Sequence, residues 1–225
     1  AGTESCRMGG RSWSPHGETC YFPIDLLQEG EIAISRVRAG AAEAATVAIG
    51  AYPYRVQHIR LDDSRRVDLS PSDLERANAE RARIDALWEL DTPRRFELPL
   101  LPPLARMQPQ ASFGSRRFFN GQPRSPHSGE DYRGSAGTPV YAVAAGVVAL
   151  AEEHFFGGNT VFIDHGDGLV SMSMHLQSMD VATGDAVEAG QQIGKVGATG
   201  RASGPHLHFG LRWRGARVDP AVLLP

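Results

Sequence analysis

Two histidines stand two residues apart in the segment SGPHLHFG, which covers residues 203–210. If this segment is a strand, residues two apart point to the same face, so His206, His208 and Gly210 share one face. Gly210 would leave room there for a group to approach the backbone. The other face carries Leu207, Phe209, Leu211 and Trp213 and suits a core. The histidine face is either the floor of a site or a polar outer face, and the pair alone does not decide between them.

A histidine and an aspartate four residues apart, His127 and Asp131, form a second group. The preceding Ser125-Pro126 and the included Gly129 favour an extended segment over a helix, and positions i and i+4 of such a segment face the same way. Imidazole nitrogen and carboxylate oxygen both bind zinc at about 2.0–2.2 Å, and a catalytic zinc usually takes three protein ligands. These two residues and one histidine of the 203–210 segment would make such a set.

A third candidate, His175, ends a strand that we expect over residues 169–175. A histidine at a strand end can project over a sheet face. Taken alone, it is more simply explained as a turn histidine that is satisfied by solvent.

The second half of the chain is expected to be almost entirely β, because Gly-rich turns divide it at short intervals. The candidate strands cover residues 140–150, 159–164, 169–175, 187–196 and 205–213. We therefore expect a mainly β protein whose C-terminal domain is a compact, antiparallel, sandwich-like sheet.

The first half has a different texture and predicts a small α+β accessory domain over residues 1–97. A helix is expected to begin after Ser70, which can cap its amides, with Pro71 in the first turn. A Pro-rich linker over residues 98–109 is expected to separate it from the second domain, residues 110–225. Strands are expected over residues 31–38, 45–51 and 57–61, and neither His16 nor His58 is interpreted as a ligand.

Cys6 and Cys20 are the only cysteines, and they lie in a segment rich in Gly, Ser and Pro. A disulfide that closes a loop of this size would stabilise the fold by about 3 kcal/mol in the chain-entropy model. Two free thiols in a cytosolic protein are the alternative. The loop-rich context favours the disulfide, which indicates an oxidising compartment.

Together, the motif His127-x3-Asp131, the dipeptide His175-Leu176 and the segment GPHLHF from Gly204 resemble the lysostaphin-type zinc metallopeptidases, also called LytM domains. The resemblance runs from about Phe113 to Pro220. It includes further segments in the order that the family shows: GTPVYA from residue 137, GNTVFIDHG from 158, GATG from 197 and the final Asp219-Pro220.

The resemblance implies one zinc ion held by His127, Asp131 and His208, with His206 and His175 as catalytic residues that are not ligands. Zinc would activate a water for attack on a peptide carbonyl and polarise the carbonyl oxygen. One imidazole would take the proton of the water and the other would stabilise the charge on the oxygen. Which of His206 and His175 is the base stays open.

One position departs from the family pattern: a tyrosine is common two residues before the His175 position, where this chain has Ser173. The arginines of the segment FGSRR, Arg116 and Arg117, are either contacts for an anionic substrate or solvated charges. The nearby His154 and His165 are interpreted as structural.

The function implied is that of a zinc-dependent endopeptidase that hydrolyses peptide cross-links of bacterial peptidoglycan. The alternative is a non-catalytic LytM-type activator of a partner cell-wall hydrolase, although such domains usually lack zinc ligands. The resemblance does not say whether a D,D bond or a glycine bridge is cut. The N-terminal domain could regulate the site, either by occluding it or by orienting it on the wall.

The 225 residues carry a net charge of -3, which argues against nucleic acid or an anionic membrane as an electrostatic partner. No apolar run approaches the roughly 20 residues that a transmembrane helix needs. A cleaved signal peptide could have preceded Ala1, and the disulfide and the resemblance together favour a periplasmic or extracellular location.

Overall fold

The computed structural model describes residues 2–51, 54–60 and 68–225. It divides into two compact units, Ala1–Pro53 and Tyr54–Pro225. The division falls well before the boundary expected at residue 97. The Pro-rich segment is part of the larger unit, because Leu100 N–H donates to Leu223 O and Leu101 N–H donates to Val143 O, each at 2.8 Å.

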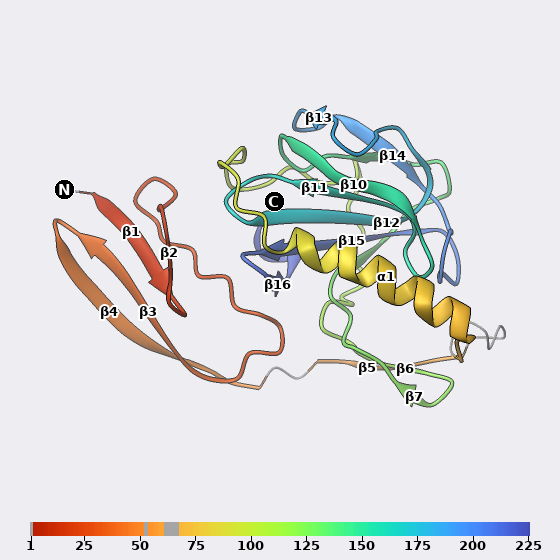
Figure 1. Cartoon of the computed structure of the whole chain (residues 1–225), viewed down its shortest axis with the longest axis horizontal. Helices are drawn as coiled ribbons and strands as arrows, with labels where there is room; N and C mark the ends of the chain where they lie inside the picture. Colours follow the sequence, from red (N-terminus) through yellow and green to blue (C-terminus); the bar gives the residue numbers. More distant parts are fainter. Residues whose placement is uncertain (1, 52–53, 61–67) are drawn as a thin grey trace. The chain divides into compact units, whose positions relative to one another are not determined.

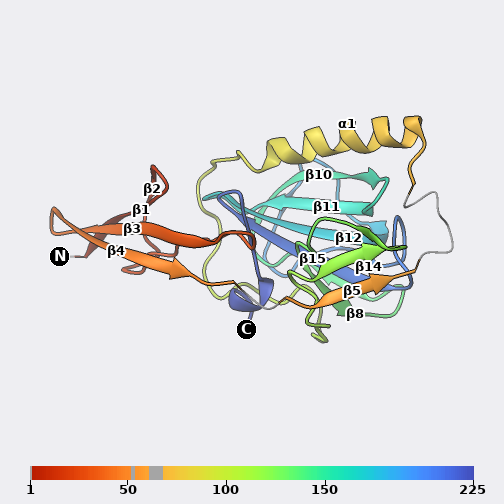
Figure 2. The ribbon, with the colours of Figure 1, turned by 90° about the horizontal axis from the view of Figure 1, so that it is seen from below.

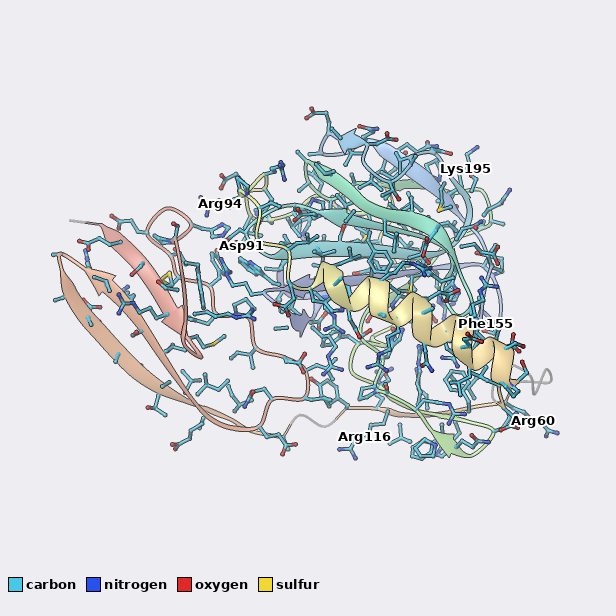
Figure 3. The ribbon with its side chains drawn as sticks, in the orientation of Figure 1. Arg60, Asp91, Arg94, Arg116, Phe155 and Lys195 are labelled. Atoms are coloured by element: carbon cyan, nitrogen blue, oxygen red, sulfur yellow. A yellow bond between two sulfur atoms is a disulfide. The ribbon has the colours of Figure 1, made fainter. Side chains whose placement is uncertain are left out.

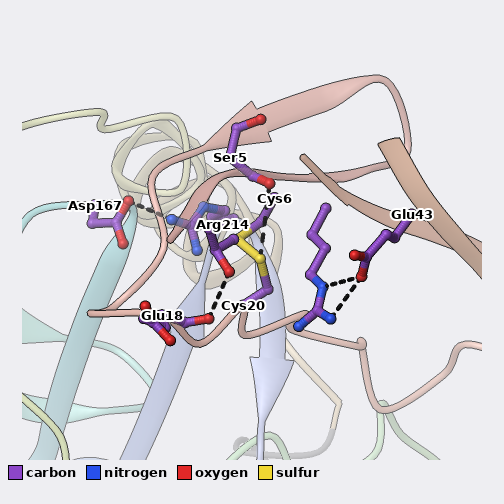
Figure 4. Close-up of a disulfide and its surroundings, with 9 residues drawn as sticks. Ser5, Cys6, Glu18, Cys20, Glu43, Asp167 and Arg214 are labelled. Carbon is purple, nitrogen blue, oxygen red and sulfur yellow. Dashed lines mark hydrogen bonds and ion pairs between the residues drawn. A yellow bond between two sulfur atoms is a disulfide. The ribbon is translucent and has the colours of Figure 1, made fainter. Parts of the chain in front are cut away.

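The first unit contains a four-stranded antiparallel sheet in the order β2-β1-β3-β4 (Figure 1). The strands are β1 Thr3–Met8, β2 Arg11–Trp13, β3 Gly30–Arg38 and β4 Ala41–Ile49. Cys6 in β1 forms the expected disulfide with Cys20 (Figure 4). In the same view Glu43 of β4 pairs with Arg36 of β3 at 2.6 Å, directly across the hairpin.

The second unit contains a three-stranded sheet and a nine-stranded sheet. In the smaller sheet, β5 Val56–Ile59 pairs in parallel with β6 Arg116–Phe119, which pairs with β7 Gln122–Pro123. The strand expected over residues 57–61 is therefore present as β5, and residue 61 lies outside the described residues.

The larger sheet follows the order β13-β10-β11-β12-β14-β9, and β15 joins it through β12 and also pairs with β16 and β8. Its strands are β8 Glu130–Arg133, β9 Pro139–Tyr141, β10 Gly146–His154, β11 Gly158–Asp164, β12 Leu169–Met179, β13 Ala186–Val187, β14 Gln192–Val196, β15 His206–Trp213 and β16 Ala216–Val218. A short 3-10 helix, η2 Pro220–Val222, follows. The fold is mainly β and antiparallel, as expected, but the strands expected over residues 140–150 and 187–196 are each broken in two.

Strand β12 changes its partner in the middle. Residues up to Met174 pair with β15, whereas residues from Leu176 onward pair with β14. His175 lies between the two pairings and has a positive φ of 63°. The expectation that His175 ends a strand is thus wrong: the residue lies at an irregularity inside β12, a kind of feature that can re-aim a side chain.

Helix α1, Pro71–Leu87, begins as expected, because the Ser70 side chain accepts a hydrogen bond from Asp73 N–H at 3.1 Å. It covers one face of the larger sheet (Figure 2), where Ile84, Leu87 and Trp88 pack against a buried cluster of Phe162, Val170 and Met172. In the described part of the chain, no helix is long and apolar enough to cross a membrane.

Polar side chains of α1 also hold it to the sheet. Arg83 forms an ion pair with Glu152 of β10 at 2.6 Å. Glu80 is buried and accepts hydrogen bonds from Phe155 N–H at 2.8 Å and from Arg76 Nε at 2.7 Å. The helix is therefore fixed to the turn between β10 and β11.

His165 is fully buried at the end of β11. Its Nδ1 lies 2.9 Å from Ala145 O and its Nε2 lies 2.8 Å from Ser171 Oγ. A neutral ring satisfies both contacts by donating to the carbonyl and accepting from the hydroxyl. Burial lowers the pKa of His165 to about 4.

We expect His165 to make stability depend on pH. In the unfolded chain its pKa is about 6.5. Between about pH 6.5 and 4 the unfolded state binds more protons than the folded state, so stability is lost as the pH falls through this window. The pKa difference corresponds to roughly 3 kcal/mol.

Urea unfolding of the wild type and of His165→Gln at pH 7 and pH 4.5 measures this effect. The glutamine does not titrate, so the advantage of the wild type over the variant should shrink at the lower pH. An advantage that is equal at both pH values would contradict the prediction.

Candidate metal centre

Three side-chain atoms converge at the start of β15: His127 Nε2, Asp131 Oδ1 and His208 Nδ1. The two nitrogens are 2.8 Å apart, and Asp131 Oδ1 lies 2.9 Å from His208 Nδ1 and 3.1 Å from His127 Nε2. His127 and His208 are buried, and Asp131 is almost fully covered. The sequence-predicted ligand set is therefore brought together, and it could hold a metal ion.

The donor set fits zinc. Two imidazole nitrogens and one carboxylate oxygen are ligands of the kind found at catalytic zinc sites, with one position left open. A tetrahedron with bonds of about 2.0–2.1 Å has edges of about 3.3 Å. The observed separations of 2.8–3.1 Å are close to that value.

The pairing of β8 with β15 creates this convergence. Asp131 lies directly opposite His208 in the antiparallel register. On β15 the side chains alternate as expected, with Leu207 and Phe209 buried in the core on the opposite face. Gly129 lets the loop approach, because a Cβ there would lie 2.8 Å from His208 Nε2.

Two residues that the sequence interpretation missed support the ligands. His127 Nδ1 donates to Ser112 O at 3.0 Å, which leaves Nε2 as the lone-pair nitrogen, and Ser112 Oγ accepts from Asp131 N–H at 2.8 Å. Buried Glu130 accepts hydrogen bonds from the N–H groups of Gln110, Ser112 and Phe113. The only sequence signal was a second carboxylate beside Asp131.

The two other predicted residues, His206 and His175, lie next to the ligands. Their ring centroids are 4.8 Å apart, and His206 Nε2 is 3.8 Å from Asp131 Oδ1. His206 Nδ1 lies 2.8 Å from Gly204 O, and His175 Nδ1 lies 2.9 Å from Thr199 O. Since a carbonyl accepts only, each Nδ1 carries the proton and each Nε2 has a free lone pair.

Burial keeps the imidazoles of His127 and His175 neutral. It lowers the pKa of His127 to about 4, helped by the charge of His208, and that of His175 to about 3, helped by the charges of His208 and His206. Burial alone would raise the pKa of Asp131, but the close contacts of its carboxylate with His127 and His208 lower it far below its usual range. Neutral imidazoles and an ionised carboxylate are the forms that bind a metal.

A cavity of about 560 Å³ opens beside the centre. Its lining includes His127, His175 and His208 of the centre. It also includes Leu74, Ala77 and Ile84 of α1. Phe119, Phe156 and Met174 add apolar surface to the lining, and the buried His154 also lines it. Segments on both sides of the expected domain boundary at residue 97 thus form one cavity.

The surroundings of Gly210, Ser173 and Arg117 determine what each of these residues can do at the centre. Gly210 does not leave room for a ligand, because Met172 fills the space and a Cβ at residue 210 would lie 2.9 Å from its Cγ. Ser173 pairs with Phe209 and is buried on the core face, so a tyrosine there would not reach the ligand face. Arg117 does contact an anion, but that anion is Asp131, at 2.8 Å.

Comparison with known proteins identifies the larger unit. The model of peptidase family M23 matches residues 125–220. The peptidoglycan DD-endopeptidase ShyA of Vibrio cholerae serotype O1 is 41% identical over 110 residues, which are 48% of this chain and 26% of ShyA. The DD-carboxypeptidase/endopeptidase Mpg of Neisseria meningitidis serogroup B is 43% identical over 100 residues, 44% of this chain and 23% of Mpg. The matched region thus spans about a quarter of each relative.

The likeness extends to the fold of nearly the whole chain. A crystal structure from Pseudomonas aeruginosa that is assigned to peptidase M23 superposes with a TM-score of 0.70 at 30% identity. The superposition covers 99% of this chain and 88% of that one. The sequence resemblance to LytM-type peptidases is confirmed, and this chain is a member of peptidase family M23.

Proposed function

We propose that this chain is a zinc-dependent endopeptidase that hydrolyses peptide cross-links of bacterial peptidoglycan. The observation that carries the proposal is the convergence of His127 Nε2, Asp131 Oδ1 and His208 Nδ1 beside two further histidines in one cavity. A non-catalytic activator would not need this arrangement, so the alternative is not favoured.

Zinc would be held by His127, Asp131 and His208, and it would supply a Lewis acid for the scissile carbonyl and for the attacking water. The tautomer of His127 and the charge of Asp131 are set before any substrate binds. Ser112 O fixes the tautomer of His127, and the buried carboxylate of Asp131 is held ionised by its two histidine neighbours.

His206 is the proposed proton acceptor. Its Nδ1–H is held by Gly204 O, so Nε2 points its lone pair toward the ligand cluster, 3.8 Å from Asp131 Oδ1. Proton transfer by a positioned imidazole typically contributes 10²–10⁴-fold to the rate. The ring of His175 lies near those of His206 and His208, with centroids 4.8 and 6.2 Å away. His175 has the same tautomer as His206, and its lowered pKa disfavours a permanently charged ring.

The relatives support a proposal for the substrate and the location. ShyA is named a peptidoglycan DD-endopeptidase and Mpg a DD-carboxypeptidase/endopeptidase, so a D,D cross-link is the proposed bond. Peptidoglycan lies outside the cytoplasm, and the disulfide Cys6–Cys20 fits an oxidising compartment. We therefore propose a periplasmic or extracellular site of action.

We also propose that α1, which lines the cavity, limits which substrates enter it. This would be a regulation of the site by the N-terminal part of the chain. The variant Glu80→Ala loses the bond to Phe155 N–H that fixes the helix. Its ratio of activity on intact sacculi to activity on soluble muropeptides should exceed that of the wild type. Equal ratios would remove α1 from the proposal.

Substitution of the two histidines of β15 should affect zinc binding differently. His208→Ala removes a ligand nitrogen and should abolish tight zinc binding, whereas His206→Ala should retain zinc and lose on the order of 10²–10⁴-fold in kcat. Titration with zinc against a chromophoric chelator measures the first effect. His58→Ala, an exposed histidine stacked on Phe118, is the matched control and should change neither property. Equal loss of zinc in both β15 variants would overturn this division of roles.

Digestion of purified cross-linked muropeptides by the zinc-loaded protein tests the reaction itself. Mass spectrometry should show dimeric muropeptides converted to monomers with one water added, by cleavage between D-alanine and the cross-linking residue. Zinc-loaded wild-type protein that leaves all muropeptides and model peptides uncut would contradict the enzyme function.

A further inference from the structure

The two oxygens of Asp131 face different partners. Oδ1 points at the ligand nitrogens, 3.1 Å from His127 Nε2 and 2.9 Å from His208 Nδ1. Oδ2 accepts a hydrogen bond from Arg117 Nη2 at 2.8 Å. The side chains of Arg117 and Asp131 are only 19% and 13% exposed, so solvent screens this pair weakly.

Arg117 is itself held from its other side. Its Nε donates to Gln57 Oε1 at 2.9 Å. Gln57 lies opposite Arg117 in the parallel pairing of β5 with β6. A continuous chain of hydrogen bonds thus runs from Gln57 through Arg117 to Asp131. Gln57 and Arg117 lie outside residues 125–220, which match the family model.

We propose that Arg117 is a positioning residue for the metal ligand Asp131, and that Gln57 fixes Arg117 in the required orientation. This inference rests on the proposed metal site. With Oδ2 taken by the guanidinium, only Oδ1 is available as a ligand, and the carboxylate cannot rotate or bind through both oxygens. Such outer partners of a metal ligand commonly contribute 10–100-fold to metal affinity.

The positive charge of Arg117 should lower zinc affinity, whereas its contact with Asp131 should raise it. A guanidinium near a divalent cation repels it, so removal of the charge alone would strengthen zinc binding. The two effects therefore predict opposite signs for the same substitution. Weaker zinc binding in Arg117→Ala would show that the orienting contact dominates.

The neighbouring Arg116 offers a matched control on the same strand. Its side chain is exposed and projects away from the sheet (Figure 3). Like Arg117→Ala, the variant Arg116→Ala removes one positive charge from β6, but it leaves the contact between Arg117 and Asp131 in place. A general effect of net charge would therefore appear in both variants, whereas positioning appears only at residue 117.

The test measures zinc affinity of the full chain by chelator competition in the wild type, Arg117→Ala, Arg117→Lys, Gln57→Ala and Arg116→Ala. We expect a 10–100-fold loss for Arg117→Ala, a smaller loss for Arg117→Lys and for Gln57→Ala, and no change for Arg116→Ala. Thermal unfolding of the zinc-free proteins identifies any variant that is not folded, and the lysine and Gln57 variants then decide the question.

A spectroscopic measurement reports the coordination directly. With Co²⁺ in place of zinc, the wild type should show the intense visible bands of a four-coordinate ion. The bands should weaken in Arg117→Ala, because the freed carboxylate can bind through two oxygens. Unchanged or tighter zinc binding together with unchanged bands in a folded Arg117→Ala protein would overturn the inference. A wild type that binds no zinc would instead refute the metal site on which it rests.

Discussion

Asp131 lies opposite His208 across the antiparallel pairing of β8 with β15, and this register brings together two parts of the chain that are 77 residues apart. Because side chains alternate along a strand, a slip of one residue would turn either candidate ligand into the core. The buried residues Leu207 and Phe209 prevent that slip, since they would have to leave the core. The core of the sheet therefore sets the position of the candidate metal centre.

Burying a carboxylate and several imidazoles in one place is costly unless every polar atom has a partner. Hydrogen bonds from outside the candidate ligand set supply several of these partners. Ser112 serves both His127 and Asp131, and Glu130 holds the Ser112 turn through three backbone N–H groups. Arg117 takes the remaining oxygen of Asp131. These contacts fix the ligand atoms before a metal or a substrate binds.

Much of the centre could be predicted from the sequence because its signals are local. The alternation in residues 206–213 predicted the two faces of β15. The spacing of His127 and Asp131 predicted two candidate ligands, and the structure brings their side chains together. The position of His175 could not be predicted, because β12 changes partner there and only the three-dimensional pairing reveals the change. Gly210 was misread for the same reason: its neighbour Met172 lies on another strand.

The domain boundary was the least predictable feature. The Pro-rich segment 98–103 resembles a linker in composition, yet its backbone bonds to residues near the C-terminus, and α1 before it walls the cavity. Composition reports where regular structure stops, but not what the irregular segment packs against. The upstream residues therefore belong to the site as much as the residues of the family match do.

A crystal structure of the zinc-soaked protein, with diffraction recorded on both sides of the zinc absorption edge, tests the account most directly. The account predicts one anomalous peak within bonding distance of His127 Nε2, Asp131 Oδ1 and His208 Nδ1, with Arg117 still on Asp131 Oδ2. A peak that is coordinated by His206 or His175, or no peak between the three ligand atoms, would contradict it.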